Sequence, residues 1–208
     1  MKRFAVFALA GALLISISYL GSIDTSLGIV PHDAIGLIYA QSLKDLNQEI
    51  SDLMSEMNPA AATNQDVVAG VLSDIFEGGF ESLADLEGYG FDLEQDFVLY
   101  VHRIPSVTEP LLSAIVRIAN QDTVLQMIKA ESGEVQSIDY NGVNYIKIVE
   151  ESACFSFLDD VMIYSKHQEV CEKTIDVYKK ETPSILENHS FTDNLDLDDV
   201  SNALGLVG

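Results

Sequence analysis

One stretch of the sequence, residues 135–180, constrains the fold more than any other, because two hairpin signals and a helix signal follow one another in it. The strand-like runs Val135–Tyr140 and Val143–Val149 flank Asn141 and Gly142. Both turn residues tolerate positive φ, which a type I′ turn requires, and that turn matches the twist of paired strands. The first part of the stretch therefore predicts a tight antiparallel hairpin.

A second hairpin and a helix follow in the same stretch. The aspartates at 159–160 predict a turn between strand-like residues 152–158 and 161–164. Ser165 and Gln168 have the spacing of a capping box, in which a hydroxyl and a carboxamide satisfy free N–H groups at a helix start. The helix that follows carries one apolar stripe, made of Val170, Cys171, Thr174, Ile175 and Tyr178. We expect this helix to cover one face of the strands.

The rest of the chain predicts further strands and helices. Strands are expected at 34–40, 97–102 and 111–118, and helices at 42–57, 64–76, 82–86, 120–129 and near 184–195. Ile35–Met57, Ala114–Lys129 and Val161–Lys179 each run apolar strand, polar cap and amphipathic helix. The sequence therefore predicts an α+β fold: a mainly antiparallel sheet with amphipathic helices on one face and repeated strand–helix units.

The first residues have the pattern of an export signal. Met1–Arg3 is basic, and Phe4–Leu20 is apolar or small throughout, as in the first two regions of a secretory signal. The apolar run is also near the shortest that spans a bilayer, so a cleaved signal and an uncleaved anchor are both open. We divide the chain into a signal peptide or N-terminal membrane anchor (1–22), a linker (23–33), a single α+β domain (34–200) and a tail (201–208). The protein is expected in the periplasm, outside the cell, or anchored at the outer face of the cytoplasmic membrane.

The charge balance limits the partners of the chain. It has 33 acidic and 11 basic residues, a net charge of −22. Nucleic-acid backbones and anionic headgroups repel such a surface, so we expect no nucleic acid as partner and membrane contact only through the N-terminal segment. The simplest interpretation of the acidic surface is solubility, although cations and basic partners also suit it.

Two cysteines, Cys154 and Cys171, occur in this exported chain, where a disulfide can persist. Strand alternation points Cys154 away from Phe155 and Phe157, so a helix packed on the phenylalanine face would keep the two sulfurs apart. A disulfide and two buried thiols are both open, and we favour the thiols.

Three segments resemble a known family. They are Pro31–Tyr39, Gly90–Asp96, and Tyr140–Tyr145 followed by Phe157–Tyr164. With the signal segment before them, they are similar to the bacterial exported family called domain of unknown function 3352, over roughly residues 29–195. The resemblance implies export and the α+β fold, and it carries no catalytic assignment. Members are often longer and no final strand is predicted at 204–208, so a shortened member and a fragment are both open.

No group of residues predicts a reaction or a metal site. The four histidines, His32, His102, His167 and His189, lack metal-ligand spacing, and no nucleophile motif surrounds a serine or cysteine. Four aspartates, Asp193, Asp196, Asp198 and Asp199, are the best cation candidates, but their order differs from an EF-hand and a solvated acidic segment is favoured. We predict no catalytic, cofactor-binding or metal residue, and no enzyme.

We therefore expect a non-enzymatic exported binding or scaffold protein of the cell envelope, which offers a sheet face or edge to an envelope protein. An alternative is a carrier of an apolar ligand between the sheet and its helices, motivated by the apolar stripe of Leu43–Met57 with Met54 and Met57. A third hypothesis is a cation-dependent module that uses the aspartates at 193–199. The sequence defines neither the partner nor the oligomeric state.

Overall fold

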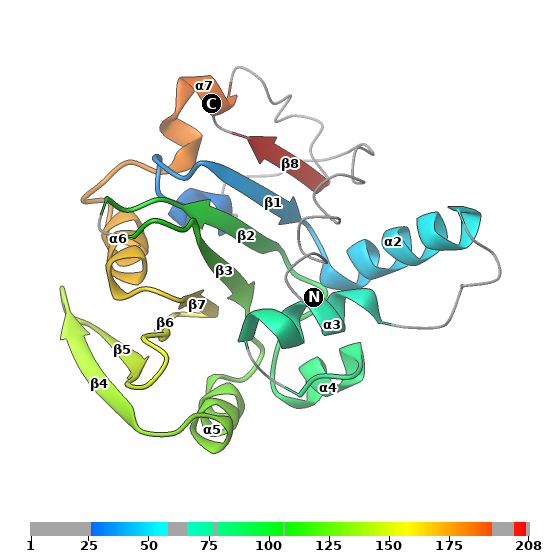
Figure 1. The fold of residues 1–208 in the computed structure, drawn as a ribbon, viewed down its shortest axis with the longest axis horizontal. Helices are drawn as coiled ribbons and strands as arrows, with labels where there is room; N and C mark the ends of the chain where they lie inside the picture. Colours follow the sequence, from blue (N-terminus) through cyan, green and yellow to red (C-terminus); the bar gives the residue numbers. More distant parts are fainter. Residues whose placement is uncertain (1–25, 58–65, 77–78, 106, 193–201, 207–208) are drawn as a thin grey trace.

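One antiparallel sheet organises the protein. The computed structural model describes residues 26–57, 66–76, 79–105, 107–192 and 202–206. Eight strands pair in the order β4-β5-β6-β7-β3-β2-β1-β8, and all neighbours are antiparallel. They are β1 (Gly36–Ala40), β2 (Phe97–His102), β3 (Leu111–Arg117), β4 (Val135–Tyr140), β5 (Val143–Ile148), β6 (Cys154–Leu158), β7 (Val161–Ser165) and β8 (Asn202–Leu206). The strands β4 and β8 form the two ends of the sheet (Figure 1).

The helices connect the strands and cover the sheet. The α-helices are α2 (Leu43–Met57), α3 (Val67–Phe76), α4 (Leu83–Gly88), α5 (Gln121–Glu131), α6 (Gln168–Tyr178) and α7 (His189–Thr192), and η2 (Ser26–Ile29) and η3 (Ile185–Glu187) are 3₁₀ helices. The α+β class and the antiparallel sheet are thus confirmed. None of the helices in the described ranges has the length and apolarity needed to cross a bilayer.

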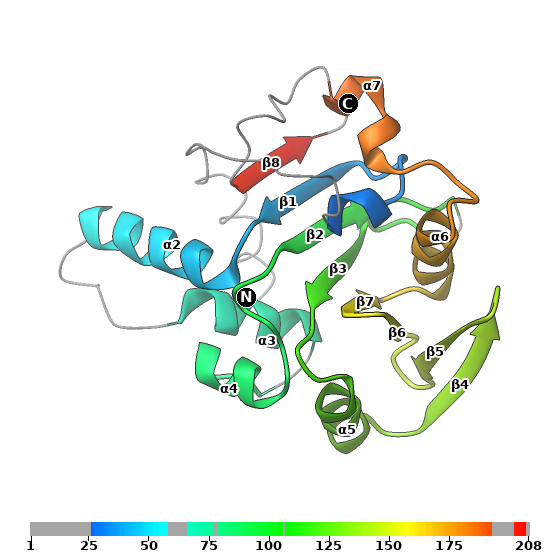
Figure 2. The same cartoon turned by 180° about the vertical axis from the view of Figure 1, so that it is seen from behind.

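The helices lie on both faces of the sheet, which differs from the expected single covered face. Two buried clusters result. The α2–α5 core includes Leu43, Leu72, Phe91, Phe97, Val124, Ala114, Val116 and Met162, and the α6 core includes Leu27, Tyr100, Ile115, Cys154, Ile163, Cys171 and Ile175. Successive residues of β3 alternate between the two cores, as a strand buried on both faces requires. The two views place α6 on one side of the sheet and α2, α3 and α4 on the other (Figure 1, Figure 2).

The repeated strand–helix unit is visible only in part. In the structure β1 leads to α2, β3 to α5 and β7 to α6, as the sequence predicts. However, α2 and α5 contribute to the α2–α5 core whereas α6 packs on the opposite face. The three units share their order of elements but not their placement on the sheet.

Both hairpins predicted from turn residues are confirmed. Asn141 and Gly142 have φ angles of 52° and 74°, the positive values that a type I′ turn needs. In the second hairpin Asp159 has a φ of 52°. Aspartate tolerates this left-handed conformation better than most residues. Local turn chemistry therefore sets the register of β4 with β5 and of β6 with β7.

The predicted helices that start at Ser42 and Asn120 begin with polar caps. The Oγ atom of Ser42 accepts a hydrogen bond from the N–H of Asp45 (3.1 Å), and the Asn120 side chain accepts one from Thr123 N–H (3.1 Å). The capping box predicted at Ser165 is wrong, because the backbone of that residue still belongs to β7. His167 caps α6 instead, and its Nδ1 atom accepts a hydrogen bond from the N–H of Glu169 (3.3 Å).

Both ends of the described chain differ from the prediction. The expected tail contains β8, which pairs along the whole length of β1, so the expectation of no final strand is wrong. The expected linker is packed against the domain: Leu27 and Val30 are buried in the α6 core, and Pro31 forms an isolated bridge with Ser184. The signal segment, residues 1–22, lies outside the described residues.

Candidate functional site

A buried histidine connects the N-terminal segment to α6. The side chain of His102 has no exposed surface. Its Nε2–H donates to Asp33 Oδ1 (2.7 Å), and Asp33 Oδ2 accepts a hydrogen bond from Lys173 Nζ (3.0 Å). Hydrogen bonding to His102, and then to Lys173, holds the pKa of Asp33 well below its ordinary value of 3.8. Among the described residues no partner reaches His102 Nδ1.

This depressed pKa predicts a pH dependence of stability. Asp33 is ionised more readily in the folded than in the unfolded chain, so its contribution is present above the unfolded pKa of about 4 and is lost as the pH falls below it. We expect the melting temperature of Asp33→Asn to fall less than that of the parent between about pH 5 and pH 2. The matched control is Asp139→Asn, at an exposed carboxylate of β4. Equal acid sensitivity of the parent and Asp33→Asn would contradict the role of the ion pair.

A second buried polar group fixes α6 to the sheet. The Thr174 hydroxyl donates to the carbonyl of Val170 (2.9 Å), so the Tyr100 hydroxyl donates to Thr174 Oγ1 (2.6 Å). Ser113 Oγ donates to Ser165 Oγ (2.9 Å) on the next strand. Burial raises the pKa of Tyr100 above its ordinary value. These groups satisfy one another's hydrogen bonds and orient α6 on β2 and β3.

The two cysteines are free and buried, as the favoured alternative has it. The condition on which the thiols were favoured, a helix packed on the phenylalanine face, is not met, because Cys154 and Cys171 both belong to the α6 core while Phe155 belongs to the other core. Burial raises the pKa of Cys154 to about 11 and that of Cys171 well above its ordinary value of 9.0. Both thiols are protonated at neutral pH, which makes them weak nucleophiles.

The other residues weighed from the sequence lie apart from one another. The backbone of His32 bonds to Pro183 and Asn188, His167 caps α6 and His189 begins α7. Within the described ranges no three His, Cys, Asp or Glu side chains gather in a way that could hold a metal ion. The aspartates at 193–199, the candidate cation ligands, lie outside the described residues.

Among the strands that the structure describes, β4 lies at an edge of the sheet and offers backbone groups that have no strand partner. In the sheet order it has one neighbour, β5. The Val149 N–H donates to the Glu134 carbonyl (3.0 Å), and because hydrogen-bonded pairs alternate along an antiparallel ladder, the N–H and C=O groups of Val135, Ser137 and Asp139 point away from β5. The side chains of Ser137 and Asp139 are exposed. An edge of this kind is a template for a further strand.

A groove lies beside this edge, on the face of the sheet that carries α5. It has a volume of about 380 Å³. Its lining comes from three parts of the chain: Gln121, Leu125 and Lys129 of α5; Val135, Ser137, Asn144, Tyr145 and Ile146 of the first hairpin; and Phe157 of β6. Four apolar members, Leu125, Val135, Ile146 and Phe157, are only half-buried. We call this the α5–β4 groove.

Contacts on the opposite face hold the β4–β5 hairpin in place. The hydroxyl of Tyr145 donates to Glu172 (2.9 Å), and that of Tyr140 donates to Asp176 (3.0 Å). The Nδ2 atom of Asn141 also donates to Asp176 (3.0 Å). Burial and the hydrogen bond to Asp176 raise the pKa of Tyr140 to about 12, so its hydroxyl stays protonated and donates at neutral pH. The hairpin is thus fixed from the α6 side, while the edge and the groove stay accessible.

A larger hollow, of about 630 Å³, lies between α3 and the start of β3. Ile75, Val107, Leu111 and Leu112 line it together with the charged side chains of Asp74, Glu109 and Lys166. Three exposed residues of the β2–β3 loop, Thr108, Glu109 and Pro110, form one wall. Within the described part of the chain, neither edge strand of the sheet contributes to its lining, in contrast to the α5–β4 groove.

Comparisons of the chain with protein-family models, with curated proteins and with solved structures found no match. The resemblance to the exported family therefore stays a prediction. Within the structure, the edge of β4 and the groove beside it form the strongest candidate site, and the chemistry they support is binding.

Proposed function

We propose that the protein is a non-enzymatic binding or scaffold module of the cell envelope, which presents the free edge of β4 to an extended segment of another envelope protein. The observation that carries the proposal is the row of outward backbone groups on Val135, Ser137 and Asp139. The signal pattern of residues 1–22 supports the location, and the protonated, buried thiols support a role without nucleophilic catalysis.

The sequence of β4 also favours strand addition. Edges that avoid pairing usually carry lysine, proline or a bulge, and Val135–Tyr140 contains neither lysine nor proline. Three outward residues offer two groups each, and a net gain of roughly 1 kcal/mol per hydrogen bond is of the same order as the cost of association. Backbone pairing alone therefore gives weak binding, so side-chain contacts must add to the affinity.

A matched pair of substitutions at Ser137 tests the proposal. Ser137→Pro removes one outward N–H and no bond to β5, whereas Ser137→Ala keeps that donor. A photoreactive residue at position 136, an exposed residue of the same edge strand, cross-links the bound segment in intact cells. We expect Ser137→Ala to retain the cross-linked partner and Ser137→Pro to lose it at an unchanged melting temperature. Equal cross-linking of both variants would refute pairing at this edge.

The α5–β4 groove also favours a second candidate, the apolar-ligand carrier. The stripe that first suggested a carrier is mostly used in packing, since Leu43, Leu46 and Ile50 are buried and Met54 is exposed. The half-buried lining of the groove is the better ligand site between sheet and helix. Native mass spectrometry of the protein released from its own membranes separates the two candidates, because a carrier retains a small apolar mass and a scaffold retains a protein.

A further inference from the structure

We infer that the α5–β4 groove selects the segment that pairs with β4: an extended strand with a large apolar side chain opposite Ser137 and a basic side chain opposite Asp139. This inference rests on the proposed function. The proposed function gives the place where the partner binds, and this inference adds the chemistry of the bound segment.

The first step is that the free edge and the groove share one face. Val135, Ser137 and Asp139 pair across the hairpin with Ile148, Ile146 and Asn144, and cross-strand partners lie on the same face. Ser137 and Ile146 line the groove. In an added antiparallel strand, the residues opposite Val135, Ser137 and Asp139 form the hydrogen-bonded pairs with them. The side chains of these opposite residues lie on the same face of the sheet as the side chain of Ser137, which is the groove side.

The second step concerns size. Ser137 is small and exposed, and it stands between the edge and the half-buried Ile146 on β5. Neighbouring strands lie about 4.8 Å apart, so an added strand lies about 10 Å from β5, and a phenylalanine-sized side chain opposite Ser137 extends over that small residue toward Ile146. There it removes apolar surface of Ile146 and of Leu125 from water. A small or polar side chain at the same position leaves the groove solvated.

The third step concerns charge. Asp139 is the one charged side chain of β4, and Glu134 precedes the strand. Opposite charges directly across a strand pair stabilise it and like charges destabilise it. The whole chain carries a net charge of −22, which opposes a second copy as the occupant and favours a basic segment. Lys129, near the end of α5 that leads into Val135, already places a positive charge in the groove lining, so a basic side chain fits best at the Asp139 end of β4.

Synthetic peptides test this inference on the full-length protein purified from its own cells. The probe is a seven-residue peptide of alternating threonines, with lysine, phenylalanine and valine at the positions opposite Asp139, Ser137 and Val135. One matched control replaces the phenylalanine by serine, and another replaces the lysine by glutamate. Amide hydrogen exchange of Ser137 and Asp139 reports pairing at the edge, and titration calorimetry reports the affinity.

We expect the probe to protect both amides and to bind at least about tenfold more tightly than the serine peptide, the effect of burying one large apolar side chain. The glutamate peptide is expected to bind more weakly than the probe at low salt. Leu125→Ser, on the α5 side of the groove, should reduce the preference for the phenylalanine peptide over the serine peptide without abolishing it, since it removes one apolar contact and leaves Ile146 in place.

The outcomes separate the inference from the proposed function. Equal affinity of the phenylalanine and serine peptides, with protected amides, overturns the groove as selector and leaves strand addition intact. Absence of protection by every peptide overturns both. Undiminished affinity of the probe for Ser137→Pro places the peptide elsewhere and also overturns both. A dimer that protects the same amides without peptide makes a second copy the occupant and overturns the basic partner.

Discussion

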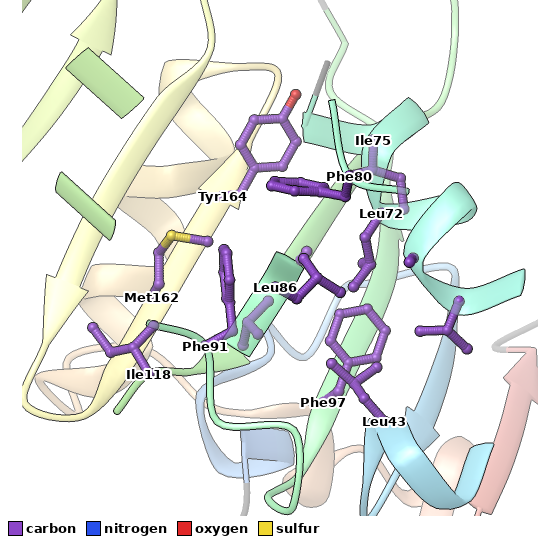
Figure 3. Close-up of a cluster of buried hydrophobic side chains, with 14 of the residues drawn as sticks. Leu43, Leu72, Ile75, Phe80, Leu86, Phe91, Phe97, Ile118, Met162 and Tyr164 are labelled. Atoms are coloured by element: carbon purple, nitrogen blue, oxygen red, sulfur yellow. The ribbon is translucent and has the colours of Figure 1, made fainter. Parts of the chain in front are cut away.

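Replacing Phe91 by alanine is expected to lower the free energy of unfolding by roughly 3–5 kcal/mol, the usual cost of deleting a buried phenylalanine. The side chain of Phe91 is 2% exposed. Its ring stacks on Phe76 at a centroid distance of 6.0 Å and meets Phe80 edge-on at 6.2 Å. In Figure 3, Phe91 lies in the cluster between Met162 of β7 and Leu86 of α4. Truncation leaves a cavity where α3, α4 and the sheet meet, which urea unfolding measures.

Two further variants serve as controls for the destabilisation by Phe91→Ala. Phe91→Leu keeps most of the volume and is expected to cost less than about 2 kcal/mol. Phe157→Ala removes the same atoms from a half-buried ring that lines the α5–β4 groove, so its cost should be clearly smaller than that of Phe91→Ala. Equal destabilisation by the two alanine variants would contradict the assignment of Phe91 to the interior and of Phe157 to an accessible groove.

The elements that sequence predicts well here are those specified by a few neighbouring residues. Asn141 and Gly142 define the first hairpin because positive φ at both positions matches one turn type. Asn120 and Ser82 begin helices where their side chains accept a backbone N–H, and both act as caps in the structure. Such signals depend only on residues within three or four positions.

The predictions that were wrong concern elements whose position depends on contacts between residues far apart in the sequence. β3 is apolar except for Ser113 and Arg117 and is buried on both faces, so its sequence does not say which helix lies on which side. The strand β8 is five residues long and contains Gly205, and it forms by pairing with β1, far away in sequence. The choice of His167 over Ser165 as cap of α6 follows from the pairing of β7 with β3, which keeps Ser165 in the sheet.

The candidate site was also predictable only in part, for the same reason. Three of the six residues of β4, Gln136, Ser137 and Asp139, are polar, which is a local sign of an exposed strand, but polarity does not tell an edge strand from an inner one. The groove is assembled from Leu125, Ile146 and Phe157 on three separate elements. Each of these residues has the ordinary pattern of a core position, and only the folded sheet brings them together at its surface.

Replacing Gly90 by alanine is expected to lower the free energy of unfolding by roughly 2–5 kcal/mol, because strain and overpacking act together. Gly90 has a φ of 94°, and an added Cβ would lie 2.7 Å from the carbonyl oxygen of Asn120. The Gly90 carbonyl accepts hydrogen bonds from the N–H groups of Ala119 (2.8 Å) and Asn120 (3.1 Å), so the two backbones cannot separate without losing them. Since Asn120 caps α5, relief of the clash must shift the start of that helix.

Alanine substitutions at two other glycines distinguish the effect of the steric clash from that of backbone strain. Gly142 has a φ of 74° with no atom within 4 Å of an added Cβ, so Gly142→Ala carries strain alone, about 1–2 kcal/mol. Gly70 lies inside α3 with equally open surroundings, and Gly70→Ala should stabilise the protein by up to about 1 kcal/mol through helix propensity. The expected order of stability is Gly70→Ala, parent, Gly142→Ala and then Gly90→Ala, measured by urea unfolding. If Gly90→Ala matched Gly142→Ala, the start of α5 would be free to yield, and the wall of the groove that α5 forms would be adjustable instead of fixed.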